Sequence, residues 1–529
     1  MQSPVRIGLP ITLEDLEDVA LRGRRVEWGD GARAKVDASR SAIDAIANAG
    51  ESAPRVYGVN TGFGALSETR IHAGDVRDLQ RNLIRSHATG IGPNLGVGEV
   101  RGMMLLRAQV LALGHSGVRS GVVDTLMAML NAGVHPRIPS QGSVGASGDL
   151  SPLAHLALVL IGEGEASVDR EVATLPRRRD LQVRPFVSGA KALADAKIMP
   201  VTLEAKEGLA LINGTQYMTS LGTLALLEAE ALATAADIVG AMSLEALKGT
   251  VKPFDERLQN ARPHPGQMVV AKNLRALLTD SAIAQSHANC GKVQDAYSLR
   301  CMPQVHGASR DALAWVRSVL EREVNSVTDN PSVFLTDGDP DIISGGNFHG
   351  QPLALALDLA AMATAELANI SERRMEQLVN PALSSGLTAF VAKDSGLHSG
   401  FMIAQVASAS LVSENKVLCH PASVDSIPSS AGKEDHVSMG SVSAKKLVEV
   451  VANTKQALAI EFMTAAAGID QRAPLTASLG ARTALAVVRE KVAPMTGDRP
   501  LYEDIAAIAA MIDSKAITKA VAAKVGGLA

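Results

Sequence analysis

Residues 141–150 read QGSVGASGDL, and the triplet Ala146-Ser147-Gly148 inside this stretch carries unusual chemistry. If a tight turn brings the Gly148 nitrogen onto the carbonyl carbon of Ala146, a five-membered ring closes. Loss of water, including the Ser147 hydroxyl, then leaves an imidazolone with an exocyclic methylene, which accepts electrons as no ordinary side chain does. A bare Ala-Ser-Gly is more often a surface turn, because small and polar residues favour turns. The surrounding residues therefore have to decide between a turn and an electrophile.

The residue types around the triplet suit ring closure. Gly148 has no Cβ atom to obstruct the attack and tolerates unusual backbone angles, and Ala146 is small. Gly142 and Gly145 leave further room for a contorted backbone. The glycines are spaced three apart, so the stretch matches neither the dinucleotide-binding GxGxxG pattern nor the phosphate-binding GxxxxGK[ST] pattern. We therefore interpret the stretch as a candidate electrophile loop.

The composition indicates closely packed helices. Hydrophobic residues make up 47% of the chain but aromatic residues only 3%, so the core has to be built mostly from Ala, Leu, Val, Ile and Met. The formal net charge is −4, from 51 basic and 55 acidic residues. This balance gives no reason to expect a nucleic acid or an anionic membrane as a partner. We expect a small-molecule substrate instead.

The cysteines and the N-terminus predict a soluble cytoplasmic protein. Cys290, Cys301 and Cys419 are too few and too scattered for a disulfide framework, and none belongs to a CxxC pair. The N-terminal residues include acidic side chains before any signal-like apolar core develops. No later stretch offers about twenty uninterrupted apolar residues for crossing a bilayer.

The sequence changes character near Pro200. Before it, short helical patterns alternate with Gly and Pro breaks and contain the loops GVNTGFG, HATGIG and GSVGASGDL. After it, tracts rich in Ala, Leu, Val, Met, Glu and Lys predict long helices at residues 218–248, 352–378, 401–418 and 441–467. Helices of this length, apolar over a wide arc, bury themselves in a bundle. We predict a mainly α protein with a loop-rich catalytic portion at 1–200, a long-helix bundle and oligomer core at 201–480 and a helical cap at 481–529.

The string GSVGASGDLSPLAH resembles the prosthetic-group loop of the aromatic amino-acid ammonia-lyase family, to which 2,3-aminomutases also belong. The resemblance runs from Tyr57 to about Asp498 and includes EGLALINGTQ, YSLRCMPQVHG, NSVTDNP, SGGNFHG and SENK. It implies a fumarase/aspartase-like central bundle and a homotetramer whose active sites are shared between subunits. It also implies a methylidene-imidazolone formed autocatalytically from Ala146, Ser147 and Gly148, with no external cofactor.

Two of the four tyrosines lie in strings that match the family. The resemblance assigns Tyr57, in YGVNTGFG, as the catalytic base and Tyr297, in QDAYSLR, as a second tyrosine that assists proton and amine handling. A deprotonated tyrosine in an electropositive site is strong enough to remove a weakly acidic β-proton. Without the resemblance, a packed tyrosine with a satisfied hydroxyl would be the commoner outcome.

Further residues of the same strings suit substrate binding. Arg300 follows Tyr297 by three residues, so the two would share a face of a helix. Its guanidinium can pair with a substrate carboxylate through two hydrogen bonds, and the resemblance assigns it this role. The resemblance also assigns Asn213 in LINGTQ and Gln294 in VQDAY as amide contacts near the prosthetic group, and Phe348 in GGNFHG as an aromatic residue packed against it.

Three features favour histidine as the substrate. Ser86 and His87 stand where family members acting on tyrosine or phenylalanine usually have His-Leu or Phe-Leu, and a polar pair suits a polar ring. Glu414 in LVSENK can pair with an imidazole N–H, whereas a phenyl ring would leave its charge desolvated and unpaired. The loop with residues 434–436, EDH, looks like that of members acting on histidine, although Lys433 departs from the usual pattern. The expected reaction is conversion of L-histidine to trans-urocanate and ammonia, the first step of histidine degradation.

Several alternatives stay open. A tyrosine or phenylalanine ammonia-lyase, or a 2,3-aminomutase, would share the fold and the electrophile. A non-catalytic helical assembly protein, or an inactive relative, would keep the fold without the electrophile. A serine hydrolase has weaker support, because SENK and SAKK match the short SxxK pattern at the level of chance. We expect no catalytic metal, since His306, His349, His420 and His436 show no HExxH or HxH spacing.

Overall fold

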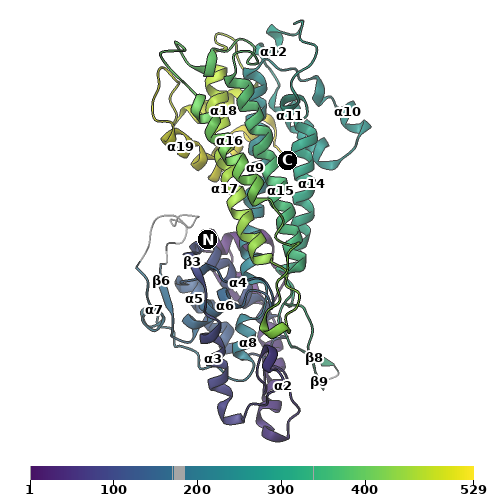
Figure 1. The fold of residues 1–529 in the computed structure, drawn as a ribbon, viewed down its shortest axis with the longest axis vertical. Helices are drawn as coiled ribbons and strands as arrows, with labels where there is room; N and C mark the ends of the chain where they lie inside the picture. Colours follow the sequence, from purple (N-terminus) through teal and green to yellow (C-terminus); the bar gives the residue numbers. More distant parts are fainter. Residues whose placement is uncertain (1, 170, 172–184, 337–338) are drawn as a thin grey trace. The chain divides into compact units, whose positions relative to one another are not determined.

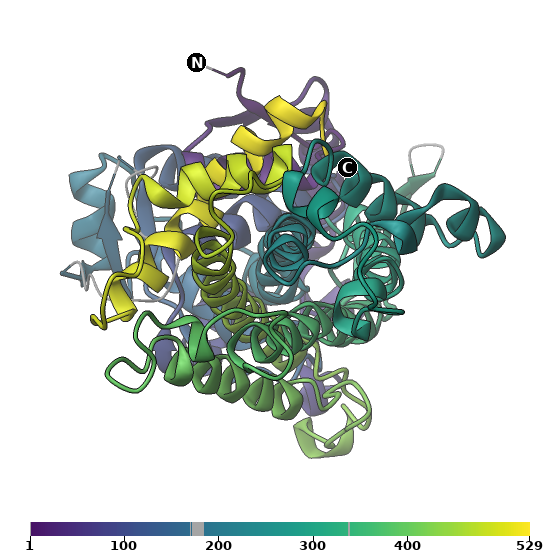
Figure 2. The same cartoon turned by 90° about the horizontal axis from the view of Figure 1, so that it is seen from above.

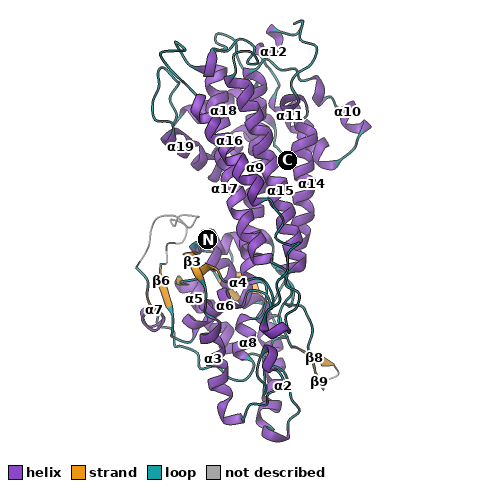
Figure 3. Cartoon of the chain, in the orientation of Figure 1, coloured by secondary structure: helices purple, strands orange, loops and turns teal. Residues whose placement is uncertain are grey.

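The computed structural model describes residues 2–169, 171, 185–336 and 339–529, and these residues are mainly helical (Figure 3). The chain forms two compact units, each assembled from three segments. Unit 1 comprises Met1–Leu224, Arg317–Leu357 and Pro421–Lys445, and unit 2 comprises Ala225–Val316, Asp358–His420 and Lys446–Ala529. The prediction of a mainly α protein with a bundle of long helices is confirmed.

Unit 1 combines short helices with all of the described strands (Figure 1). Its helices are α1 (Leu13–Arg22), α2 (Ala32–Asn48), α3 (Val76–His87), α4 (Val97–Ala112), α5 (Ser120–Ala132), α6 (Leu150–Leu160), α7 (Gly189–Asp195) and α8 (Glu207–Ile212). Its strands are β1 (Val5–Ile7), β2 (Val26–Trp28), β3 (Ile91–Asn94), β4 (Val134–Pro136), β5 (Pro139–Gln141), β6 (Glu165–Val168), β7 (Val187–Ser188), β8 (Ser332–Thr336) and β9 (Asp339–Ile343). The pairs are β1 with β2 in parallel and β3 with β5, β4 with β6, β6 with β7 and β8 with β9 antiparallel. These small sheets serve to fix the loops between the helices.

Helix α4 forms the core of unit 1, and nearly all of its side chains are buried. Its apolar residues are spread over every side of the helix, and such a helix has to be enclosed by other elements. Even Arg101 is inside, where its guanidinium donates to the backbone carbonyls of Val19 and Leu130 at 2.9 Å. Burial lowers the pKa of Arg101 to about 10. The carbonyl groups of neighbouring elements therefore replace water around this cation.

Unit 2 is built around long helices that lie side by side (Figures 1 and 2). Its helices are α9 (Gln216–Ala246), α10 (Glu256–Ala261), α11 (Pro265–Leu277), α12 (Ala282–Ser286), α13 (Tyr297–Arg300), α14 (Met302–Glu323), α15 (Gln351–Val379), α16 (Met402–Leu418), α17 (Gly440–Asp470), α18 (Leu479–Arg489), α19 (Tyr502–Asp513) and α20 (Ala516–Val525). Unit boundaries fall inside α9, α14, α15 and α17, whose remaining residues belong to unit 1. The four predicted long tracts coincide with α9, α15, α16 and α17 to within three residues at each end.

Buried charges join the long helices of unit 2. Arg374 on α15 donates to both carboxylate oxygens of Glu461 on α17, at 2.5 and 2.8 Å. Ser243 on α9 and Ser371 on α15 each donate to the same carboxylate at 2.6 Å. His306 on α14 lies 3.4 Å from Arg374 and forms a further 2.7 Å hydrogen bond with Asp237 on α9. The pairing compensates each charge, which is the condition for burying it.

Helix α15 is the one helix among the described residues that is long and apolar enough to cross a membrane. The mean hydropathy of its most apolar 18-residue window is 1.5, and 67% of that window is buried inside the structure. Burial of this kind is typical of a core helix in a bundle. The residues described here also contain no group of three or more His, Cys, Asp or Glu side chains placed to hold a metal ion.

Candidate active site

The triplet loop connects β5 to α6 in unit 1 and depends on glycine. Gly145 and Gly148 have φ values of 69° and 73°, in the left-handed region. A Cβ atom added at Gly148 would lie 2.2 Å from the carbonyl oxygen of Gly214, which is far inside contact distance. The backbone therefore admits only glycine at this position. This crowded turn next to Ala146 and Ser147 fits the requirements of ring closure.

The segment that follows α8 holds the end of the triplet loop. Gly148 and Gly214 form a parallel β-bridge, and the backbone N–H of Asp149 donates to the Gly214 carbonyl at 2.7 Å. Asn213 precedes this contact, and its side-chain oxygen is buried with no hydrogen-bond partner in the part of the chain that the structure describes. Asn213 thus offers an acceptor beside the loop, where the sequence predicted a contact to the prosthetic group.

Residues before α17 fix the loop from another side. The Ser438 hydroxyl donates to the Gly145 carbonyl at 3.1 Å, and the backbone N–H of Met439 donates to the Val144 carbonyl at 2.9 Å. These bonds join residues almost three hundred positions apart in the chain. The turn is therefore held by tertiary contacts as well as by its own sequence.

Ser147 borders a cavity of about 220 Å³ in unit 1. Its hydroxyl donates to Oε1 of Glu434 at 2.9 Å, and Oε2 of the same carboxylate accepts from Ser429 at 2.6 Å. The polar lining consists of Ser86, His87, Thr89, Ser143, Ser147, Ser151, Ser429 and Glu434. The sequence indicated Glu434 only as part of a loop resembling that of members acting on histidine. Its position on the reactive hydroxyl is a finding of the structure.

His87, at the end of α3, lines the same cavity. Its Nδ1 lies 2.9 Å from the Leu83 carbonyl, so we place the ring hydrogen on Nδ1, where it donates to that oxygen. This tautomer leaves Nε2 as an acceptor. Burial lowers the pKa of His87, while the Leu83 carbonyl and the charge of Glu434 act in the opposite direction. His87 is therefore mainly neutral near pH 7.

Tyr57 is influenced by the same carboxylate. Its Oη accepts a hydrogen bond from the backbone N–H of Gly64 at 3.3 Å, and its ring packs edge-on against Phe63. Burial raises the pKa of the Tyr57 phenol, the Gly64 N–H opposes this effect, and the negative charge of Glu434 adds to it. In this environment the phenol stays protonated at neutral pH, so formation of the phenolate requires a positive charge from elsewhere.

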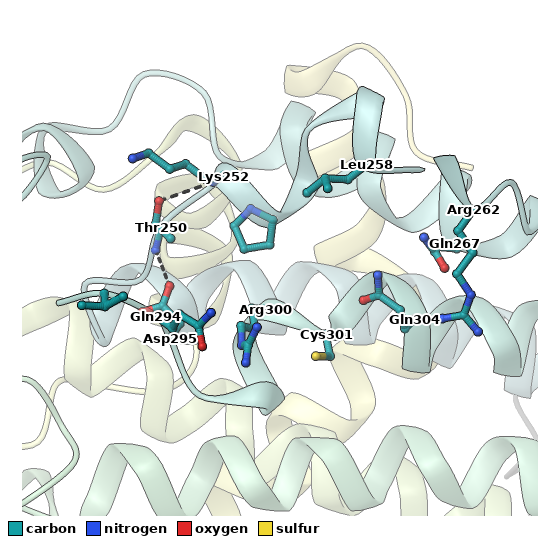
Figure 4. A pocket seen from close by; sticks show the side chains of 12 residues that line it. Thr250, Lys252, Leu258, Arg262, Gln267, Gln294, Asp295, Arg300, Cys301 and Gln304 are labelled. Carbon is teal, nitrogen blue, oxygen red and sulfur yellow. Dashed lines mark hydrogen bonds between the residues drawn. The ribbon is translucent and has the colours of Figure 1, made fainter. Parts of the chain in front are cut away.

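Three of the predicted residues stand together in unit 2. Gln294 and Arg300 line a second cavity, of about 440 Å³ (Figure 4). The guanidinium carbon of Arg300 lies 4.5 Å from the centre of the Tyr297 ring, and Tyr297 is 71% exposed. The Nε atom of Arg300 is buried and has no hydrogen-bond partner within the described residues. Arg300 therefore has one donor unused within the described residues, and its role as carboxylate anchor stays a prediction.

Phe348 and Glu414, like Tyr57, Asn213 and Tyr297, are not among the residues that line either cavity. Phe348 is half-buried in the segment before α15 in unit 1. Glu414 is exposed on α16 in unit 2, where its carboxylate accepts from the Asn453 amide at 3.3 Å. The carboxylate that shares a cavity with His87 within unit 1 is that of Glu434.

Comparison with known proteins gives the class of this fold and site. The family model described as aromatic amino acid lyase matches residues 11–490. The chain belongs to the aromatic amino acid lyase family. The prediction of the family, and with it of a carbon–nitrogen lyase, is confirmed.

Individual relatives are similar over their full length. The chain is 66% identical over 525 residues to a histidine ammonia-lyase from Sorangium cellulosum (strain So ce56), with 99% of each chain covered. The crystal structure of a histidine ammonia-lyase from Trypanosoma cruzi matches with a TM-score of 0.88 and 43% identity, over 98% of this chain and 95% of that one. A tyrosine aminomutase from Streptomyces globisporus matches with a TM-score of 0.90 and 37% identity, over 98% and 99% of the chains.

Proposed function

We propose that this chain converts L-histidine to trans-urocanate and ammonia by non-oxidative elimination. The observation that carries the proposal is the cavity of unit 1, where Ser147 of the triplet, His87 and Glu434 lie together. The names of the similar proteins from Sorangium cellulosum and Trypanosoma cruzi support histidine as the substrate. The site combines a reactive triplet with polar groups suited to an imidazole ring.

We further propose that Ala146, Ser147 and Gly148 cyclise to a methylidene-imidazolone, with no external cofactor. This group supplies an electrophile that draws electron density from the bound substrate, so that ammonia leaves more readily. The Ser147 hydroxyl, held by Glu434 at 2.9 Å, is positioned to leave as water. Asn213 contributes a buried acceptor next to the finished group, and Phe348 is proposed to pack against it.

Glu434 is our candidate for recognition of the substrate ring. When Ser147 loses its hydroxyl, Oε1 of Glu434 loses a hydrogen-bond donor, while Ser429 still holds Oε2 at 2.6 Å. Oε1 is then an acceptor for an imidazole N–H, and neutral His87 lines the same cavity. A phenyl ring would leave the carboxylate desolvated and unpaired, which costs free energy. The proposal thus transfers to Glu434 the role that the sequence predicted for Glu414.

In this mechanism Tyr57 removes the β-proton of the substrate. Its phenol must be deprotonated first, and burial together with Glu434 holds its pKa above the ordinary value. No lysine or arginine lines the cavity of unit 1 in the described part of the chain. Both the phenolate and the substrate carboxylate need a cation, so the site requires a positive charge from another surface.

We propose that Arg300 of another subunit supplies that charge in a homotetramer with shared active sites. Arg300 has a buried donor that finds no partner among the described residues, and Tyr297 and Gln294 lie beside it in unit 2. A complementation experiment tests this sharing. Variants R300Q and S147A should each be inactive alone, and co-expression should restore part of the activity in mixed oligomers. Absence of any restoration, with mixed oligomers verified by mass, would contradict the shared site.

The substrate is tested by a panel of L-histidine, L-tyrosine and L-phenylalanine. Ammonia release, absorbance of the unsaturated acid and product mass are followed for each amino acid. Urocanate from histidine alone supports the proposal. Coumarate or cinnamate would replace histidine with another substrate of the same chemistry. The structural similarity to a tyrosine aminomutase makes a β-amino acid the product to exclude.

We also propose that the enzyme works in the cytoplasm. All three cysteines, Cys290, Cys301 and Cys419, are free in the structure, which suits a reducing compartment. Recovery of the activity in the soluble fraction of gently lysed cells, separate from membrane and secreted fractions, checks this placement.

A further inference from the structure

A chain of hydroxyl groups connects a buried carboxyl to the triplet loop. Oδ1 of Asp149 lies 2.8 Å from Oγ of Ser441, and this Oγ lies 2.8 Å from Oγ of Ser143. The Ser143 hydroxyl in turn lies 3.3 Å from the Gly148 carbonyl oxygen and accepts from the Gly145 N–H at 3.1 Å. Ser143 therefore contacts both Gly145, the residue before the triplet, and Gly148, its last residue.

The hydrogen atoms in this series of hydroxyl groups can be assigned to donors and acceptors. A serine hydroxyl has one hydrogen to donate, and an ionised carboxylate can only accept. If Asp149 is protonated, it donates to Ser441, Ser441 donates to Ser143, and Ser143 donates to the Gly148 carbonyl. If Asp149 is ionised, Ser441 must donate to Asp149. Ser143 then donates to Ser441, and the Gly148 carbonyl loses this hydrogen bond.

We propose that Ser441 and Ser143 act as positioning residues that transmit the protonation state of Asp149 to Gly148, and that ring closure of the triplet is faster in the protonated state. The inference rests on the proposed formation of the electrophile from residues 146–148. It adds a pH-dependent control of maturation, through Asp149 and Ser441, which do not line the substrate cavity, and Ser143, which does.

The surroundings of Asp149 allow both states near neutral pH. Burial raises the pKa of Asp149 to about 7, against hydrogen bonds from the backbone N–H of Met218, the Ser441 hydroxyl and the backbone N–H of Tyr217. Among the described residues, Glu323 on α14 is the charged group that acts on Asp149, and its negative charge raises this pKa further. The contacts from α9 and α17 are neutral N–H and hydroxyl groups.

The Gly148 hydrogen bond matters because Gly148 provides the nucleophile. Ring closure forms a bond from the Gly148 nitrogen to the Ala146 carbonyl carbon, whose oxygen leaves as water with the amide hydrogens of Gly148 and Ser147. A second water leaves with the hydroxyl and the α-hydrogen of Ser147. The Ser143 contact and the Asp149 N–H bond to Gly214 at 2.7 Å hold residue 148 from both sides. Loss of either contact gives the Gly148 nitrogen, the nucleophile, more freedom to move away from the Ala146 carbonyl carbon.

The experiment follows maturation of the full-length chain as a function of pH. The chain is made by cell-free translation and transferred to buffers from about pH 6 to 9, a range that brackets the pKa of a perturbed carboxyl. Loss of two water molecules from the peptide containing the triplet is measured by mass, and near-ultraviolet absorbance gives the extent of ring formation. For the wild type we expect the rate of ring formation to fall sigmoidally with rising pH, by about fivefold to tenfold. This factor corresponds to the free energy of one neutral hydrogen bond.

Four variants separate the relay from simpler roles. In S441A the Ser143 hydroxyl is free to donate to Gly148 at every pH, so the profile should be flat at the fast rate, whereas S441T keeps the hydroxyl and should keep the profile. D149N, whose amide donates permanently, should also be flat. S443A removes a hydroxyl in the same turn of α17 that lies 3.5 Å from the Met439 carbonyl, and it should match the wild type.

Each result has a defined meaning. A wild-type profile retained in S441A would overturn the relay, and so would a flat profile in the wild type. Failure of D149N to form the ring, although the protein folds with a normal melting temperature, would make Asp149 a direct acid or base and would also overturn it. If the wild type never loses water at any pH, the proposed electrophile itself fails, which is a different outcome.

Discussion

Replacement of Glu434 by glutamine tests how this enzyme selects the ring of its substrate. Oε1 of Glu434 accepts from Ser147 at 2.9 Å and Oε2 accepts from Ser429 at 2.6 Å. A glutamine keeps the shape and one acceptor, so the Ser147 contact and ring formation should survive. The substitution removes the negative charge that is proposed to accept an imidazole N–H. The same substitution removes a charge that raises the pKa of Tyr57, an effect common to both substrates, so the ratio of the kcat/KM values for two amino acids isolates recognition of the ring.

The size of the effect follows from the kind of hydrogen bond that is lost. A hydrogen bond to a charged group contributes about 1.5–3 kcal/mol, and each 1.4 kcal/mol is a factor of about ten. For E434Q, kcat/KM for L-histidine should fall about 10- to 100-fold. The same change removes an unpaired charge opposite a phenyl ring, so kcat/KM for L-phenylalanine should stay equal or rise. The ratio of the two values should therefore change by more than the histidine value alone.

The assay measures kcat/KM for both amino acids, normalised to the near-ultraviolet absorbance of the prosthetic group. E414Q is the matched control, since Glu414 is exposed and has a 3.3 Å contact with Asn453. Substitution of an exposed group of this kind changes free energies by less than about 0.5 kcal/mol, so its selectivity should stay within about twofold of the wild type. An E434Q enzyme with unchanged selectivity, beside an E414Q enzyme that has lost it, would refute the reasoning and restore Glu414 as the ring partner.

Other predictions concern the base, the electrophile and the buried charges. Y57F should lower kcat by about a hundredfold or more with little change in KM, because proton transfer by a positioned base contributes about 10²–10⁴-fold. Because the pKa of Tyr57 is raised, wild-type kcat should increase with pH on the alkaline side. This increase should disappear in Y57F. S147A should fold with the wild-type melting temperature but lack the near-ultraviolet absorbance and most turnover, and full activity in S147A would exclude the triplet as the electrophile. E461Q should lower the free energy of unfolding, measured by urea titration, by about 3 kcal/mol, because it leaves the buried Arg374 guanidinium without its charge partner. The control D280N breaks the exposed pair with Arg482 and should lower the same free energy by less than about 1 kcal/mol. Burial lowers the pKa of His306 below its ordinary 6.5, so the folded chain binds fewer protons at this group than the unfolded chain does. The contribution of His306 to the free energy of unfolding is therefore complete above about pH 6.5. It decreases as the pH falls from there toward the lowered pKa. Urea titrations at several pH values should show this slope in the wild type and a weaker one in H306N.

The long helices were predictable because their signal is local. The tracts at residues 218–248, 352–378 and 441–467 contain almost uninterrupted helix-forming residues, and the structure has α9, α15 and α17 there. Helix propensity and apolar content are properties of a continuous segment. Their assembly is not local, since Arg374 and Glu461 meet across 87 positions of the chain.

In the candidate site, too, the local features could be predicted from the sequence and the contacts between distant segments could not. The triplet could be identified from its own residues and from the string around it. The partner of its serine could not, because Ser147 and Glu434 are 287 positions apart and no periodicity connects them. From the sequence, Glu414 was predicted to contact the imidazole ring, because it is a carboxylate within the family string SENK. The structure places the carboxylate of Glu434 on the triplet and leaves Glu414 in contact with Asn453.

The sequence by itself determined the membership of the family, the mainly helical class and the position of the triplet proposed to form the electrophile. Each of these depends on residues that are adjacent in the chain, where backbone chemistry and helix propensity act. Tertiary structure alone decided that Gly148 is held against Gly214, that Ser147 donates to Glu434, and that Asp149 is connected to the loop through Ser441 and Ser143. These contacts join distant segments, and they arise only when burial of the apolar helices brings those segments together.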